Sequence, residues 1–199
     1  MNKLIRFWRF LKEDTWQSWI VSLILMVILI KVVFFPTLSF ITGSPLPLVV
    51  IESCSMYHGT NFDKWWTKSE GYYEIKEIEK EDFEEFSFRN GMNKGDIIVV
   101  WGRDEPELGD VIIFQPDTKS SGQHPIIHRV ITIEPLGTKG DHNERQLQSG
   151  NNVEGIDETD IAPGNVLGKS VIKIPLVGWV KLLFFEFSRP PEQRGLCRP

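Results

Sequence analysis

The 199-residue sequence has only two cysteines, Cys54 and Cys197. They are too few for a disulfide framework and form no CxxC pair of the kind that binds zinc or carries thiol redox chemistry. We therefore infer no redox compartment from them and expect that replacing Cys54 matters little. Basic residues are also in the minority, with 22 Lys and Arg against 27 Asp and Glu and a formal net charge of -5. This balance argues against nucleic acid as the main partner.

Histidine is scarce as well, with four in the chain. His124, His128 and His142 form no HExxH pattern and have no carboxylate-rich surroundings, so we predict no metal site. The 13 Phe and 7 Trp, in a chain that is 41% hydrophobic, exclude a disordered protein. The length allows one ordinary domain plus additional segments.

One long apolar run, Trp19 to Phe35, stands near the N-terminus and is followed by Pro36. At a rise of ~1.5 Å per residue, a helix over residues 16–36 can cross a hydrocarbon layer of ~30 Å. Basic residues precede the run, so the positive-inside rule keeps the N-terminus in the cytoplasm and the chain after Pro36 outside. The alternative, a cleavable secretory signal, is disfavoured by the length of the run and by the lack of a clean small-x-small cleavage site.

Two further segments have membrane character. Residues 1–15 place apolar residues at helical spacing among basic ones, which predicts a cytoplasmic amphipathic segment on the inner leaflet. Residues 176–187 are apolar but too short to span a membrane. That second segment either dips into the outer leaflet or packs as a last strand or helix on the core.

Residues 37–199 have the pattern of a compact, mostly antiparallel β domain. Short runs rich in Val and Ile, bounded by Gly, Pro and Asp, predict strands at 48–52, 96–102, 110–116, 125–134 and 166–175. Between the first two lies an insertion at 59–94, whose acidic and aromatic residues predict one or two short solvated helices with their aromatic side chains packed inward. We favour a small separate core there over a lid that contacts substrate.

Three residues in separate β segments could together form an activated nucleophile: a serine, a histidine and an aspartate. Ser55 follows the first strand, His128 lies in PIIHRVI, and Asp141 ends TKGD. A serine hydroxyl is a weak nucleophile without an adjacent base, and a histidine oriented by an acid can supply that base. Each residue alone is more often structural, and only the combination indicates catalysis.

The chain resembles the type I signal peptidases, specifically the archaeal and endoplasmic-reticulum branch, which uses histidine where the bacterial branch uses lysine. The N-terminal anchor, SCSM, GDIIVV, GDVIIF, PIIHRVI, TKGDHN and LGKSVIKIPLVGWV occur in the family's order and cover most of the chain outside 59–94. The resemblance implies a signal-peptidase-type β catalytic domain with Ser55 as nucleophile, His128 as general base and Asp141 as the acidic partner. It also implies that Ser53 joins Ser55 in an oxyanion hole.

The sequence departs from the family pattern at the acid and around the nucleophile. Cys54 replaces the usual glycine, and His58 stands where a proline often closes the motif. The family's second aspartate has no clear counterpart, and Asp157 and Asp160 are the candidates. Either can orient His128, or both can simply cap a turn.

The resemblance implies a serine endopeptidase that cuts exported preproteins after small residues and needs no cofactor. Its expected partners are preproteins with signal peptides, the lipid bilayer and, as a further candidate, the protein translocation channel. Two alternatives stay open: a non-catalytic membrane-tethered assembly subunit of the same fold, and a specialised peptidase for surface-protein precursors.

Overall fold

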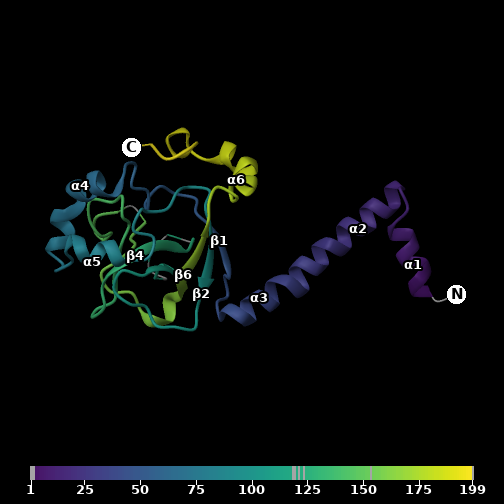
Figure 1. The fold of residues 1–199 in the computed structure, drawn as a ribbon, viewed down its shortest axis with the longest axis horizontal. Helices are drawn as coiled ribbons and strands as arrows, with labels where there is room; N and C mark the ends of the chain where they lie inside the picture. The colour runs from purple at the N-terminus through teal and green to yellow at the C-terminus, as the bar shows by residue number, and fades with distance from the viewer. Residues whose placement is uncertain (1–2, 118–119, 121, 123, 153, 199) are drawn as a thin grey trace. The chain divides into compact units, whose positions relative to one another are not determined.

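The structure is a computed structural model that describes residues 3–117, 120, 122, 124–152 and 154–198. The chain divides into two units, Met1–Ile41 and Thr42–Pro199, and each is described by itself. Figure 1 shows the helices of the first unit in purple and blue, and the sheet of the second.

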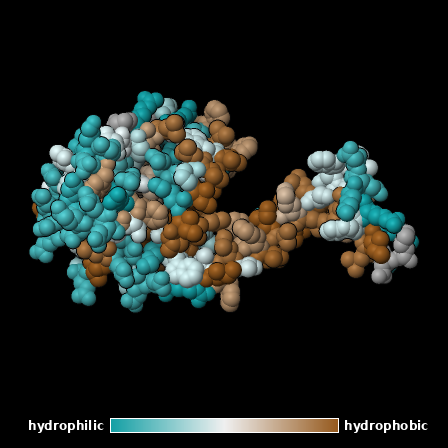
Figure 2. Space-filling view, in the orientation of Figure 1, coloured by the Kyte–Doolittle hydropathy of each residue, from teal (hydrophilic) through white to brown (hydrophobic). Residues whose placement is uncertain are grey.

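The first unit consists of helices. Helix α1 covers Lys3–Leu11, and after a turn the chain continues as α2 (Trp16–Ile28), a π-helical stretch (Leu29–Phe34) and α3 (Phe35–Thr42). Thr15 caps α2 by accepting a hydrogen bond from the backbone N–H of Ser18. In the part of the chain that the structure describes, one helix, Trp16–Thr42, is long and apolar enough to cross a membrane. Most of its side chains are hydrophobic and exposed (Figure 2).

This helix does not end at Pro36, as the sequence suggested, but runs six residues farther to Thr42. Proline lacks an N–H group and clashes with the preceding turn of a regular α-helix. Here the preceding turn is π-helical, and the N–H of Phe35 donates to the carbonyl of Ile30, five residues back. The wider turn lets Pro36 occupy the second position of α3, where a missing N–H costs little.

The second unit is built on one six-stranded sheet in the order β1-β2-β6-β3-β4-β5, in which every pair of neighbours is antiparallel. The strands are β1 (Leu48–Val50), β2 (Ile97–Trp101), β3 (Val111–Phe114), β4 (Ile126–Thr132), β5 (Gly137–Lys139) and β6 (Val166–Ile174). Five of them lie where the sequence predicts strands, and the sheet is compatible with a mainly β domain. The short β5 was not predicted, because Gly-Thr-Lys has no apolar pattern.

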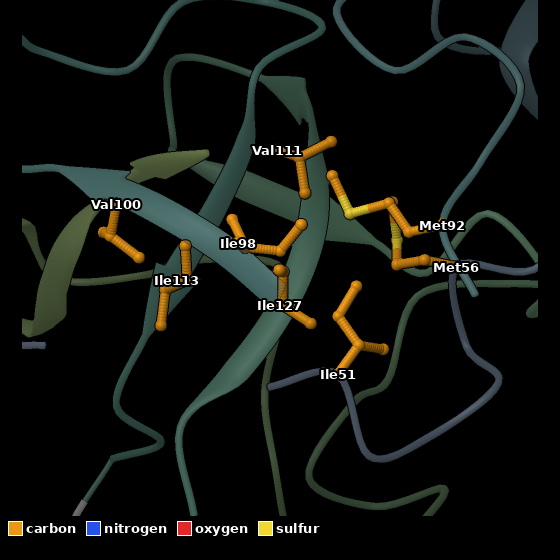
Figure 3. Close-up of a cluster of buried hydrophobic side chains, with 8 residues drawn as sticks. All are labelled: Ile51, Met56, Met92, Ile98, Val100, Val111, Ile113 and Ile127. Carbon is orange, nitrogen blue, oxygen red and sulfur yellow. The ribbon is translucent and has the colours of Figure 1, made fainter. Parts of the chain in front are cut away.

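The main core lies against strands β2, β3 and β4. Its members come from these strands and from the segments around the serine turn and Met92, and they gather in one cluster (Figure 3): Ile51, Met56, Met92, Ile98, Val100, Val111, Ile113 and Ile127. Ile51 and Met56 are both only 1% exposed. Because these two residues bracket the serine turn at 52–55, the turn is anchored in the core at both ends.

The insertion at 59–94 forms the two short helices that the sequence predicts, α4 (Phe62–Glu74) and α5 (Lys80–Glu85). Asn61 caps α4 by accepting a hydrogen bond from the N–H of Lys64. The predicted inward packing of aromatic residues is confirmed, and the insertion's buried cluster is Trp65, Trp66, Tyr73, Ile78 and Phe83, with Ile131 of β4. The insertion therefore shares its core with the strand that carries His128.

The C-terminal segment contains helix α6 (Trp179–Phe185) and two 3-10 turns, Glu186–Ser188 and Pro191–Gln193. Leu182 is buried, whereas Val180, Leu183, Phe184 and Phe187 are exposed, and hydrophobic surface gathers there in Figure 2. The segment ends in a disulfide between Cys197 and Cys54, with a Cα–Cα distance of 5.6 Å. The expectation that replacing Cys54 matters little did not take this disulfide into account.

Candidate active site

The serine turn follows β1 and presents two hydroxyls. Ser53 is exposed and Ser55 half-buried, and their Oγ atoms lie 3.1 Å apart. The backbone beneath them is fixed, because the carbonyl of Ser55 accepts from the N–H of His142 at 2.8 Å and that of Met56 accepts from the N–H of Met92 at 2.8 Å. The turn thus combines a rigid backbone with hydroxyl groups that remain accessible.

His128 lies in the middle of β4, opposite Ile112 of β3, and is 4% exposed. Its Nδ1 contacts the carboxylate of Glu158, which is fully buried. Glu158 is held in turn by the Thr138 hydroxyl, which donates to Oε1 at 3.1 Å, and by the backbone N–H of Leu147, which donates to Oε2 at 2.8 Å. A carboxylate on Nδ1 keeps the proton on that nitrogen and leaves Nε2 as the acceptor.

Gly140 brings the serine turn and the histidine together. A Cβ atom added to Gly140 would lie 2.7 Å from Nε2 of His128 and 2.8 Å from the carbonyl oxygen of Ser55. Only glycine leaves room for both groups to approach the same point of the backbone. No hydrogen bond joins Ser55 Oγ to His128 within the described ranges. Such bonds are often long without substrate and tighten when it binds.

Asp141 does not contact His128 but belongs to a separate buried network. Its carboxylate accepts two hydrogen bonds from Arg129, at 2.9 and 2.8 Å, one from His58 Nε2 at 2.9 Å and one from the Tyr73 hydroxyl at 3.1 Å. Burial would raise the pKa of Asp141, but the charge of Arg129 and the hydrogen bonds from His58 and Arg129 outweigh burial and hold the pKa well below its usual range. Asp141 is therefore an ionised anchor for Arg129.

His58 belongs to the same network and differs from His128 in its setting. Its ring stacks on Trp65 with centroids 3.7 Å apart, and burial lowers its pKa in spite of the hydrogen bond to Asp141. Its lowered pKa keeps His58 neutral, and its Nε2–H donates a hydrogen bond to Asp141. His58 thereby connects the serine turn, three residues away, to Asp141.

The other two predicted acids point away from the site. Asp157 and Asp160 are exposed, and Asp157 accepts hydrogen bonds from the N–H and hydroxyl of Thr159, which is a local turn contact. Glu158, between them, is the acid that the sequence reasoning missed because only aspartates were considered. The signal in the sequence is weak: Glu158 stands two residues after Ile156, the spacing at which residues of an extended segment share a face. In the structure Ile156 and Glu158 are both buried, whereas Asp157 is exposed.

A cavity of about 490 Å³ lies under the insertion and borders the network of Asp141 and His58. Its lining includes His58, Trp65, Tyr72, Lys139, Asp141 and His142. Burial lowers the pKa of Lys139 to about 8, although Asp141 and Glu158 oppose this effect. No group of three or more His, Cys, Asp or Glu residues suited to a metal ion occurs among the residues with a described position.

No protein-family model matches the chain. It is similar to proteins named signal peptidase complex catalytic subunit SEC11: 28% identity over 110 residues with that of Colletotrichum graminicola, covering 51% of this chain and 60% of the relative. With the Verticillium alfalfae protein the identity is 26% over 166 residues, covering 75% of this chain and 70% of the relative. With the Ogataea parapolymorpha protein it is 28% over 115 residues, covering 50% and 64%.

These similarities support a relationship to the type I signal peptidases. In the first of them, the chain spans 60% of the length of its relative. The relatives are fungal, so the assignment to an archaeal branch stays a prediction from the sequence.

Proposed function

We propose that this chain is a membrane-anchored serine endopeptidase that removes signal peptides from exported preproteins. The observation that carries the proposal is the arrangement around Gly140, where Ser55 and His128 approach one glycine and a buried carboxylate lies on the far nitrogen of the imidazole. A binding protein has no need of such a nucleophile, base and acid in one place. The SEC11 relatives, which are named as catalytic subunits, add independent support.

The reaction proposed is acyl transfer. His128 Nε2 takes the proton of Ser55 as Oγ attacks the carbonyl carbon of the substrate, and later gives it to the leaving amine. Water then releases the acyl group from Ser55, again with His128 as base. Glu158, rather than Asp141, Asp157 or Asp160, holds the imidazole in the right tautomer and stabilises its charged form.

The negative oxygen that forms during attack needs hydrogen-bond donors. The backbone N–H of Ser55 and the hydroxyl of Ser53 are suited to this role, because the two serines share one fixed turn and their Oγ atoms lie 3.1 Å apart. Ser53 is then a catalytic residue that contributes binding of charge rather than proton transfer.

The substrate is an extended segment with small residues before the cut bond. β1 is the terminal strand of the sheet and leads directly into the serine turn. An extended peptide can add to such an edge through main-chain hydrogen bonds, with alternate side chains in shallow pockets. Cutting after small residues is the specificity that the resemblance implies, and the edge strand is the element we propose for it.

The proposed topology keeps residues 1–15 on the cytoplasmic leaflet, the helix from Trp16 in the membrane and the β domain outside. The Cys54–Cys197 disulfide supports an external domain, since disulfides persist in oxidising compartments. Preproteins are the proposed substrates. The relatives' names refer to a complex, so further subunits are proposed partners, as is the translocation channel.

Detergent-solubilised protein incubated with a model preprotein, with the cut mapped by mass spectrometry, tests this function. We expect one cut after a small residue at the end of the signal peptide, and none with Ser55→Ala. A specialised precursor peptidase would cut only surface-protein precursors. A folded protein that cuts no preprotein would contradict the proposal and favour the assembly subunit.

A further inference from the structure

The C-terminal segment Glu186–Cys197 is fastened to both chain neighbours of Ser53. On one side, Arg189 Nη1 donates to the backbone carbonyl of Glu52 at 3.0 Å, and its Nη2 contacts the Glu52 carboxylate. On the other side, Cys197 forms the disulfide with Cys54. Ser53 is thus the one residue between two attachment points that belong to the far end of the sequence.

The other end of this segment is fixed to the body of the domain. Lys94 is 1% exposed, and its Nζ donates to Glu186 Oε1 at 2.5 Å and to the carbonyl of Gln193 at 2.7 Å. The indole of Trp179 donates to the carbonyl of Lys94 at 3.1 Å. Because it is anchored at Lys94, the segment can transmit a fixed position to residues 52–54 instead of moving with them.

The hydroxyl of Ser53 is weakly constrained by its own contacts. The side chain is exposed, and Ser55 Oγ is its hydrogen-bond partner in the structure. An oxyanion donor must sit within about 0.5 Å of its productive position to be effective. The backbone on either side must therefore supply the order that the side chain lacks.

We propose that the C-terminal segment Glu186–Cys197 is a positioning element for the oxyanion hole, acting on Ser53 through the Cys54–Cys197 disulfide and the Arg189–Glu52 contacts. The inference rests on the proposed peptidase function and adds a role for residues outside the catalytic set. It differs from a purely stabilising role, in which the disulfide acts by restricting the unfolded chain over its separation of 143 residues. Stabilisation alone would leave the kinetics of the folded enzyme unchanged.

The test is a double-mutant cycle with Cys197→Ser, which breaks the disulfide without replacing any residue of the serine turn and leaves Cys54 as a thiol. Cleavage of a model preprotein is measured in wild type, Cys197→Ser, Ser53→Ala and the double variant. We expect Cys197→Ser to lower kcat about 10-fold, less than the ~10²- to 10³-fold expected for loss of a whole donor, with KM within about twofold. In the Ser53→Ala background, Cys197→Ser should cost less than about twofold, because the group it positions is gone.

Equal losses in the two backgrounds, or no loss in either, would overturn the inference. Leu196→Ser is the matched control, since Leu196 adjoins Cys197 and is 65% exposed; it should keep wild-type kinetics. Circular dichroism at the assay temperature verifies that each variant is folded. If Cys197→Ser does not fold, Arg189→Gln enters the same cycle, with a smaller expected loss of about 3- to 5-fold.

Reductant gives a second readout of the same idea. A thiol reductant should lower kcat of the wild type to that of Cys197→Ser and leave Cys197→Ser unchanged. A wild type that cleaves preproteins with the same kcat before and after verified reduction refutes the positioning role and leaves the peptidase intact. A folded wild type that cleaves nothing refutes both.

Discussion

Two neighbouring residues of β4, His128 and Arg129, each reach a buried carboxylate, and the two pairs differ in chemistry. His128 contacts Glu158, whereas Arg129 makes a two-point contact with Asp141. Successive side chains of a strand point to opposite faces, so the two pairs lie on different sides of β4. A histidine can take up and release a proton near neutral pH, but an arginine cannot. A buried acid near the candidate histidine is therefore not by itself the acid that orients it.

The largest effects should come from the two residues that are proposed to react. Ser55→Ala and His128→Ala should each lower kcat by at least ~10⁴-fold, because either change removes the activated nucleophile. The double variant should be no worse than each single one. Initial rates on a model preprotein measure this, and additive losses would argue that the two residues do not act as a unit.

Asp141→Asn should lower the stability of the fold more than it lowers kcat. Removing one partner of a buried ion pair leaves the other charge uncompensated, at a cost of ~3 to 5 kcal/mol in the free energy of unfolding. Denaturant unfolding at pH 7 measures this loss. At a temperature where the variant is folded, we expect kcat to fall far less than in Ser55→Ala; an inactive but fully stable Asp141→Asn would reverse the roles of the two acids.

The same carboxylate predicts how stability depends on acid. Because the pKa of folded Asp141 is depressed, the unfolded chain binds a proton more readily than the folded one. Its contribution is complete above the ordinary aspartate pKa of ~3.9 and is lost as pH falls below that value. The free energy of unfolding should therefore drop more steeply below pH ~4 in wild type than in Asp141→Asn.

Lys139 should make stability depend on pH as well, by a smaller amount and at alkaline pH. Burial lowers its pKa to about 8 in the folded state, whereas an unfolded lysine titrates near ~10.4. Between these two values the unfolded state binds more protons, so stability should rise with pH in that window. Comparing unfolding of wild type and Lys139→Met from pH 7.5 to 10 tests this; Lys80→Met, at an exposed salt bridge with Asp63, is the control.

The smallest effects are expected at Asp157 and Asp160, which the sequence had marked as candidate acids. Both side chains are exposed and neither contacts His128 in the described structure. Asp157→Asn and Asp160→Asn should keep kcat within about threefold of wild type. A loss near that of His128→Ala in either would mean that the loop around Glu158 rearranges when substrate binds.

The sequence predicted the sheet well because its strands are short Val- and Ile-rich runs with clear turn residues at their ends. It also predicted the aromatic core of the insertion, where Trp65 and Trp66 of α4 and Phe83 of α5 are buried in one cluster. The hydrophobic pattern does not predict that the helix continues past Pro36. The continuation depends on the π-helical hydrogen bonds of the residues before Pro36.

For the candidate site, the sequence pointed to Ser55 and His128 but not to the residues that contact them or their neighbours. Ser55 and His128 meet at Gly140, but no sequence pattern pairs His128 with Glu158 across 30 residues, or Cys54 with Cys197 across 143. Both links depend on the path of loops. Asp141 was predicted to be the acidic partner of His128, to which it is close in sequence. In the structure its carboxylate accepts hydrogen bonds from Arg129 instead.

If Glu158 is the acid of a Ser55–His128 peptidase, Glu158→Gln should lose most of its turnover. The variant keeps the size of the side chain and an acceptor oxygen but removes the charge that stabilises the imidazolium. Preprotein cleavage and thermal unfolding are measured on the same sample, beside Asp157→Asn as the neighbouring control. We predict a folded protein with kcat lowered by ~10³- to 10⁴-fold. A folded Glu158→Gln that cleaves at a rate close to that of wild type would show that Glu158 is not the acid that supports His128.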